Sequence, residues 1–196
     1  AAINFKKLCQ SKGKNYSVCV VEKGSEVGAH ILSGAILQPT ALDELIEGWR
    51  SDESCPVKTL VKSEELKYLS ESKSYNLPKF FIPKVMHNDN NFIISLGSLC
   101  KWLGTRAEAM GVEICPGFAA SDIILSEGKL TGIITSDLGL DKDGKPGSNF
   151  QPGIEIHSKY TLFAEGCRGH LGKRLIEQFN LRENSQHQTY GIGLKE

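Results

Sequence analysis

Short apolar runs separated by polar turns predict an α/β fold at the start of the chain. The β-rich run over 16–22 predicts a strand that ends at Glu22, and a helix-like segment over 1–10 comes before it. A second short apolar run, over 112–115, predicts another strand. Strands that alternate with helices are typical of an α/β domain, and we expect that class of fold.

Two helices are expected between these strands. Apolar residues recur at helical spacing over 99–110, and Ser95 or Ser98 could cap the start of that helix. A shorter helix is expected over 40–47, with Thr40 as its cap.

The second half of the chain predicts mainly antiparallel structure. Two β-rich runs over 121–136 flank the dipeptide Glu127-Gly128, which predicts a hairpin with a two-residue turn. Strands are expected over 154–157 and 160–163, and a basic helix over 169–179. The whole pattern predicts an α/β domain that includes an antiparallel excursion.

Residues 51–90 interrupt the regular pattern. This stretch is polar at first and then becomes apolar over 77–86, where two prolines favour an edge strand, a hairpin or an exposed loop. We interpret 51–90 as an insertion. Its apolar end, flanked by lysines, could dip into a membrane interface, or it could be a hairpin that covers a core. The apolar residues in question are Phe80, Phe81, Ile82, Val85 and Met86.

Composition narrows the possible functions only a little. The 23 basic and 23 acidic residues balance, so charge gives no reason to expect nucleic acid as a partner. No apolar run approaches the roughly 20 residues that span a bilayer. The six cysteines show no CxxC pair, so their spacing does not indicate a zinc or iron–sulfur site, and the histidines show no metal-binding spacing.

Glu22 is the first candidate for a binding residue. In a dinucleotide-binding unit, an acidic residue closes the second strand roughly 20 residues after a glycine-rich turn and accepts the ribose hydroxyls of adenosine. That spacing would put the glycine turn upstream of Ala1, so we expect a domain that is cut off inside its first helix. A carboxylate would repel the 2′-phosphate of NADP, which favours FAD or NAD. The alternative is an ordinary buried strand followed by a solvated Glu22–Lys23 pair.

The turn over 162–170 is the second candidate. An apolar run ends in Glu165 and Gly166, and Gly169 then opens the basic helix. Bare backbone at a helix N-terminus suits a pyrophosphate or a ribityl chain. The alternative is a strand-to-helix turn in which the acid only orders the turn by accepting backbone N–H groups.

Four segments together resemble the electron transfer flavoprotein–ubiquinone oxidoreductase family. They lie at 20–35, 109–120, 163–171 and 189–196, and the resemblance covers essentially the whole chain in order. It implies a truncated, Rossmann-like FAD-binding domain of the glutathione-reductase type over 1–50 and 91–196. That domain would carry an antiparallel meander and an inserted quinone- and membrane-facing element at 51–90.

The resemblance also implies an activity and its cofactors. The enzyme would be an electron-transferring-flavoprotein dehydrogenase, which passes electrons from reduced electron transfer flavoprotein to ubiquinone through FAD and a [4Fe–4S] cluster. The cluster ligands would lie outside this chain. The protein would sit peripherally on the cytoplasmic face of a bacterial inner membrane, or on the matrix side of the mitochondrial one. No catalytic nucleophile or base is expected, because the protein positions cofactors.

Site residues carried over from the resemblance fall into two groups. The expected cofactor-binding residues are Glu22, Lys23, Gly28, Ala29, His30, Ser33, Gly34, Ala35, Ala119, Ala120, Glu165 and Gly166. The expected membrane- or quinone-proximal residues are Phe80, Phe81, Ile82, Pro83, Val85 and Met86.

Two other functions are compatible with the same residues. One is an FAD-dependent monooxygenase or reductase of the same superfold that oxidises NAD(P)H. The other is a non-enzymatic binding module in which the glycine turns are purely structural.

Overall fold

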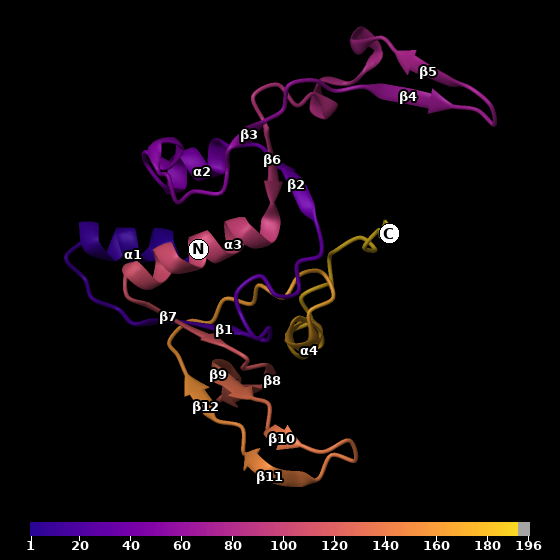
Figure 1. Cartoon of the computed structure of the whole chain (residues 1–196). Helices are drawn as coiled ribbons and strands as arrows, with labels where there is room; N and C mark the ends of the chain where they lie inside the picture. The colour runs from indigo at the N-terminus through magenta and orange to yellow at the C-terminus, as the bar shows by residue number, and fades with distance from the viewer. Residues whose placement is uncertain (192–196) are drawn as a thin grey trace. The chain divides into compact units, whose positions relative to one another are not determined.

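The computed structural model describes residues 1–191 and separates the chain into two compact units, Ala1–Gly117 and Phe118–Glu196 (Figure 1). Each unit is described by itself below. The structure is a mixed α/β arrangement with several small sheets, as the alternation of elements predicts. The division into 1–50 with 91–196 and an insertion at 51–90 stays a prediction. The end of the fourth resembling segment, residues 192–196, lies outside the described residues.

A pair of parallel strands lies at one end of the first unit. Strand β1 (Val18–Glu22) pairs in parallel with β7 (Val112–Pro116), with Val18 opposite Val112 and Glu22 opposite Pro116. Helix α1 (Ala2–Ser11) precedes β1, and helix α3 (Leu96–Ala109) precedes β7. Ile3, Ala107 and Val112 form a small buried cluster that joins both helices to the sheet.

Helix α3 has the cap that the sequence predicts. Ser95 is its N-cap, and the Ser95 hydroxyl oxygen accepts a hydrogen bond from the Ser98 backbone N–H at 3.3 Å. Helix α2 (Thr40–Leu45) differs from the prediction. Its N-cap is Pro39 and no side chain caps it, so Thr40 is the first helical residue and the expected cap is wrong.

The larger core of the first unit lies between α3 and an antiparallel sheet. That sheet has the order β2-β6-β3, and its strands are β2 (Gly34–Leu37), β6 (Phe92–Ser95) and β3 (Thr59–Leu60). Trp49, which begins the short helix η1 (Trp49–Ser51), is 2 % exposed and packs edge-on against Phe92 with ring centroids 5.4 Å apart. The buried members of this core are Leu42, Trp49, Cys55, Val57, Ile94, Leu99 and Trp102.

A hairpin and two short helical turns form residues 66–86, midway along the sequence of the first unit. The hairpin pairs β4 (Leu66–Leu69) with β5 (Ser74–Leu77). Two single-turn 3₁₀ helices, η2 (Lys79–Phe81) and η3 (Lys84–Met86), follow it. The prolines therefore end regular strand pairing at Leu77, as their lack of an N–H donor predicts.

The second unit contains the predicted hairpin. Strands β8 (Ala120–Ser126) and β9 (Lys129–Thr135) pair across Glu127 and Gly128, whose φ values are 51° and 74°. Two consecutive positive φ angles match the twist of the hairpin, which explains the glycine. The other elements are β12 (Glu155–His157), which pairs with β9, the ribbon of β10 (Leu138–Leu140) with β11 (Pro146–Gln151), and helix α4 (His170–Gln178).

The strand expected over 160–163 is absent from the described part of the chain. None of the described strands pairs with this segment, and Tyr160 and Leu162 are 96 % and 74 % exposed. An apolar run needs a hydrogen-bonding neighbour before it becomes a strand, and local pattern alone could not show that this run has none here.

Within residues 1–191, no helix combines the length and apolar character needed to cross a membrane.

Truncation of Leu99 to Ala should destabilise the first unit by about 2–5 kcal/mol, because Leu99 is 6 % exposed in the main core. Leu8→Ala is the matched control, since Leu8 is 50 % exposed on α1, and it should change stability by less than about 0.5 kcal/mol. Urea unfolding followed by tryptophan fluorescence measures both, because Trp49 and Trp102 are the only tryptophans and both lie in this unit. Equal midpoints for the two variants would contradict this core assignment.

Candidate functional site

The edge where β1 and β7 end holds the first predicted site residue. Glu22 is the last residue of β1, and its Oε1 accepts a hydrogen bond from the backbone N–H of Gly24 at 2.6 Å. The Gly24 carbonyl in turn accepts a hydrogen bond from the Gly117 N–H at 2.7 Å, just after β7. The Glu22 carboxylate therefore shapes the loop that follows it, which the solvated Glu22–Lys23 alternative does not anticipate.

The loop after Glu22 runs against the first turn of α3. Gly28 has φ +84°, and a Cβ built on it would lie 3.1 Å from the Gly97 carbonyl oxygen. About two turns further along α3, Val27 packs against Gly104, where a Cβ would lie 3.5 Å from the Val27 methyl groups. Only glycine combines this backbone angle with this close approach, so the glycine-rich pattern here is a packing requirement.

Backbone also approaches backbone where the loop enters β2. A Cβ on Gly34 would lie 2.6 Å from the Ile94 carbonyl oxygen of β6, a distance that leaves no room for a side chain. Five other predicted residues of this loop and strand are exposed, so they are accessible from solvent in this unit. They are Lys23, Ala29, His30, Ser33 and Ala35.

The Glu22 carboxylate also influences the pKa of a cysteine in α3, Cys100. Burial raises the pKa of the Cys100 thiol, and the negative charge of Glu22 raises it further. The strand end, the glycine loop and the first turns of α3 thus form one connected neighbourhood in the first unit. This neighbourhood contains the predicted residues from Glu22 to Ala35.

Four predicted cofactor residues lie in the second unit. Glu165 accepts hydrogen bonds from the backbone N–H groups of Leu171 at 3.3 Å and Gly172 at 2.8 Å, at the start of α4. Gly166 has φ +77°, and a Cβ on Gly169 would lie 2.5 Å from the Glu165 Cβ. In this structure the acid therefore orders the turn, as the structural alternative states. The other two residues are Ala119 and Ala120, the latter opposite Thr135 in the β8–β9 hairpin.

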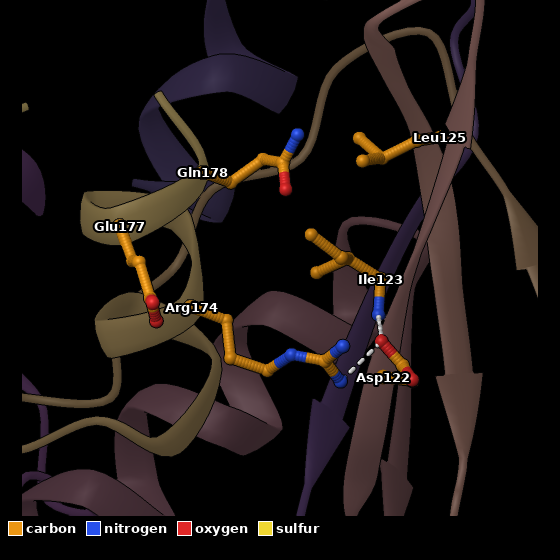
Figure 2. Close-up of a pocket in the computed structure, with 6 residues that line it drawn as sticks. All are labelled: Asp122, Ile123, Leu125, Arg174, Glu177 and Gln178. Carbon is orange, nitrogen blue, oxygen red and sulfur yellow. Dashed lines mark hydrogen bonds and ion pairs between the residues drawn. The ribbon is translucent and has the colours of Figure 1, made fainter. Parts of the chain in front are cut away.

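A groove between α4 and β8 was not anticipated from the sequence. It has a volume of about 520 Å³ (Figure 2). Arg174 reaches across it, with 2.5 Å between its Nη1 and Oδ1 of Asp122, which also accepts the Ile123 N–H at 2.6 Å. The hydrogen bond from Arg174, with that from Ile123, lowers the pKa of Asp122. The pairing spans about 50 positions in sequence, so no local signal indicates it.

The apolar segment over 77–86 is largely exposed. Phe80, Phe81 and Val85 are 81 %, 69 % and 93 % exposed, and the two phenyl ring centroids are 4.3 Å apart. Met86 and Pro83 are exposed as well, whereas Ile82 is buried at 9 %. The segment repeats the pattern Pro-Lys-x-x-x twice, and each copy forms one 3₁₀ turn that directs its central apolar residues outward.

Comparison with known proteins identifies a class of oxidoreductases. The chain is 53 % identical to a protein of Acinetobacter baylyi (strain ATCC 33305 / BD413 / ADP1) over 199 residues, 51 % to one of Pseudomonas aeruginosa over 199 and 46 % to a mitochondrial one of Bos taurus over 198. All are named electron transfer flavoprotein–ubiquinone oxidoreductase, the first as probable. The resemblance inferred from the four segments is therefore confirmed. Each match covers 100 % of this chain but only 35 %, 36 % and 32 % of the relative, so the chain spans about a third of their length.

Other comparisons add little. No protein-family model matches the chain. A crystal structure of FqzB matches 69 % of this chain and 30 % of that chain, with a TM-score of 0.44 and 14 % identity. That likeness is too low to support an argument about fold or function.

Loss of the Asp122 carboxylate should loosen α4. Because the pKa of Asp122 is lowered in the folded state, the ion pair stabilises the fold at neutral pH, and the benefit disappears as the pH falls through that lowered pKa. Asp122→Asn should therefore speed hydrogen exchange over 170–178 at pH 7 and flatten its acid dependence. Glu177→Gln, on the other wall of the groove, is the control. Identical exchange in wild type and Asp122→Asn would refute the role of this pair.

Proposed function

We propose that this chain is part of an oxidoreductase that passes electrons from reduced electron transfer flavoprotein, through FAD and a [4Fe–4S] cluster, to ubiquinone. The observation that carries the proposal is the 46–53 % identity, over the whole chain, to proteins of that name from two bacteria and an animal. The matches extend over the whole chain, so the proposal does not depend on one motif.

We assign the adenosine end of FAD to the neighbourhood of Glu22. The assignment is supported by a carboxylate at the carboxyl end of a parallel strand. One carboxylate oxygen of Glu22 is already used by the Gly24 N–H, and the other is available for a ribose hydroxyl. These residues fit a nucleotide.

The remaining cofactor residues follow from the same proposal. Lys23, Ala29, His30, Ser33 and Ala35 would line the pyrophosphate and flavin through their backbone and exposed side chains. In the second unit, Ala119 and Ala120 would lie beside the adenine, and Glu165 and Gly166 near the pyrophosphate and ribityl chain. The fold assignment, a Rossmann-like domain of the glutathione-reductase type with 51–90 inserted, is proposed with them. Its support in the structure is the parallel β1–β7 pair preceded by α3.

Bound FAD would supply the change between one- and two-electron transfer. This chain's own residues would bind and orient it. Glu22 would fix the ribose by accepting hydrogen bonds from its hydroxyl groups, and the exposed loop backbone would contact the pyrophosphate. No residue of the chain is assigned an acid–base step. The six cysteines are not gathered into a metal-binding group within residues 1–191, and the proposal gives the cluster no ligand in this chain.

We further propose that residues 78–86, called the tip below, contact a membrane surface near the quinone. The support is the exposure of Phe80, Phe81 and Val85 beside two lysines, a composition suited to the boundary between acyl chains and head groups. The protein would then be peripheral, on the cytoplasmic face of a bacterial inner membrane or the matrix side of the mitochondrial one. Mitochondrial relatives are among the matches.

The electron donor distinguishes this proposal from an NAD(P)H-dependent monooxygenase or reductase. Stopped-flow absorbance of the intact, flavin-loaded enzyme should show rapid flavin reduction by reduced electron transfer flavoprotein and none on that timescale by NADH or NADPH. Subsequent oxidation by a soluble ubiquinone analogue completes the test. Fast reduction by NADH, or purification of the intact protein without flavin, would overturn the proposal.

Placing negative charge on the tip tests its proposed contact with a membrane. Phe80→Asp with Phe81→Asp should lower binding of the intact protein to liposomes on the order of 100-fold, because each buried phenyl side chain contributes about 1.5–3 kcal/mol. Phe5→Asp with Leu8→Asp changes two exposed apolar residues of α1 and is the matched control. Sedimentation with vesicles of neutral and anionic lipid measures both variants. Unchanged partitioning of the tip variant would reject the membrane contact.

A further inference from the structure

A group of polar residues lies at the base of the apolar tip. Each 3₁₀ turn of the tip ends on an inward residue, Ile82 after the first and His87 after the second. His87 is adjacent in space to Glu64, which precedes β4, and to Lys79, Asn88 and Asp89. We call these five residues the tip base.

The tautomer of His87 is fixed by a backbone carbonyl. Its Nε2 lies 3.0 Å from the Ile82 carbonyl oxygen. A carbonyl oxygen only accepts hydrogen bonds, so Nε2 must carry the proton and donate it. In the neutral ring, Nδ1 is then an acceptor with its lone pair pointing outward.

The other ring nitrogen faces two carboxylates. His87 Nδ1 lies 4.0 Å from Glu64 Oε1 and 4.0 Å from Asp89 Oδ2. An acceptor beside two acceptors is unfavourable, and 4.0 Å is longer than a hydrogen bond. A proton on Nδ1 would turn this contact into a charge-assisted donor between two anions.

The two carboxylate oxygens of Glu64 have different partners. Its Oε2 accepts the Asn88 backbone N–H at 2.9 Å and the Asn88 side-chain amide at 3.1 Å. Its Oε1 is buried and faces the Lys79 ammonium in an ion pair, with Nζ 3.4 Å away. Burial by itself raises the pKa of Glu64, but the donors from Asn88 and Lys79 outweigh it and hold the pKa below its ordinary value. The side chain is therefore an anion at neutral pH.

Two carboxylates and two ammonium groups lie at the base of the tip. Lys79 Nζ also pairs with Asp89 at 3.0 Å, so one ammonium serves two carboxylates. Lys62 lines the same cavity, but among the described residues no ion pair joins it to either carboxylate. The cavity has a volume of about 70 Å³ and is lined also by Glu64 and Asp89.

We propose that His87 is a proton-operated clamp on the tip. With Nδ1 protonated, the ring bridges the Ile82 carbonyl oxygen and the carboxylates of Glu64 and Asp89. The tip is then held against the residues just before β4. With Nδ1 neutral, the Ile82 hydrogen bond and the Lys79 ion pairs remain, but the link from the ring to Glu64 and Asp89 is lost, so the tip is freer to open. The clamp goes beyond the proposed function and does not depend on it, because it concerns the tip's attachment whatever surface the tip meets.

Hydrogen exchange of the intact protein measures the clamp directly. Protection of the backbone amides over 79–87, corrected for intrinsic rates, is compared at pH about 5.5 and about 8, on either side of ordinary histidine titration. We expect roughly two- to fivefold greater protection at the lower pH, the size of a partly exposed ion pair. His87→Gln should keep a donor to the Ile82 carbonyl but lose the pH dependence. His157→Gln, which removes a histidine paired with Glu155 in the second unit, should keep it.

Glu64→Gln combined with Asp89→Asn provides the deciding variant if His87→Gln leaves the tip unprotected at both pH values. It keeps the shapes of both side chains but removes both anions that face Nδ1, so protection should no longer depend on pH. Equal protection of the wild-type tip at the two pH values overturns the clamp. Persistence of the pH dependence in this double variant or in His87→Gln overturns it as well.

Discussion

The parallel pairing of β1 with β7 is the constraint on which the first unit depends. Parallel neighbours end at the same edge of a sheet, so the pairing brings Glu22 beside Pro116. It also lets the Gly117 N–H donate a hydrogen bond to the Gly24 carbonyl oxygen. The connection through α3 then sets the helix against the loop that follows β1. The contact of Gly28 with Gly97 is a consequence of this arrangement, because neither chain could approach so closely with a side chain present.

Two acids in the chain share one structural task, since each accepts backbone N–H groups at a glycine-rich turn. Glu22 does so at Gly24, and Glu165 does so at the start of α4. A carboxylate that orders backbone in this way is held in a fixed place and still has lone pairs to spare. Binding sites that are preformed lose less free energy on ordering, so the structural and the proposed binding roles of Glu22 support each other.

Local chemistry explains which elements could be predicted. The cap of α3 at Ser95 and the turn at Glu127-Gly128 rest on a few neighbouring residues, and both were predicted correctly. The strand predicted over 160–163 does not form among the described residues, because a strand needs a hydrogen-bonding partner strand from elsewhere in the chain. The Asp122–Arg174 pair and the grouping of His87 with Glu64 could not be predicted, since both depend on packing between distant segments. Glu22 was proposed from spacing and the residues around it from the family resemblance, and their binding roles stay predictions; the hydrogen bond to Gly24 was not predicted.

The central claim is that the carboxylate at the end of β1 was placed to hold the ribose of a bound flavin nucleotide. A crystal structure of the intact protein with FAD tests it most directly. The account predicts a Glu22 carboxylate oxygen within hydrogen-bond distance of an adenosine ribose hydroxyl, with the Gly24 bond retained. A structure in which FAD is bound and the Glu22 side chain contacts no part of the nucleotide would contradict it.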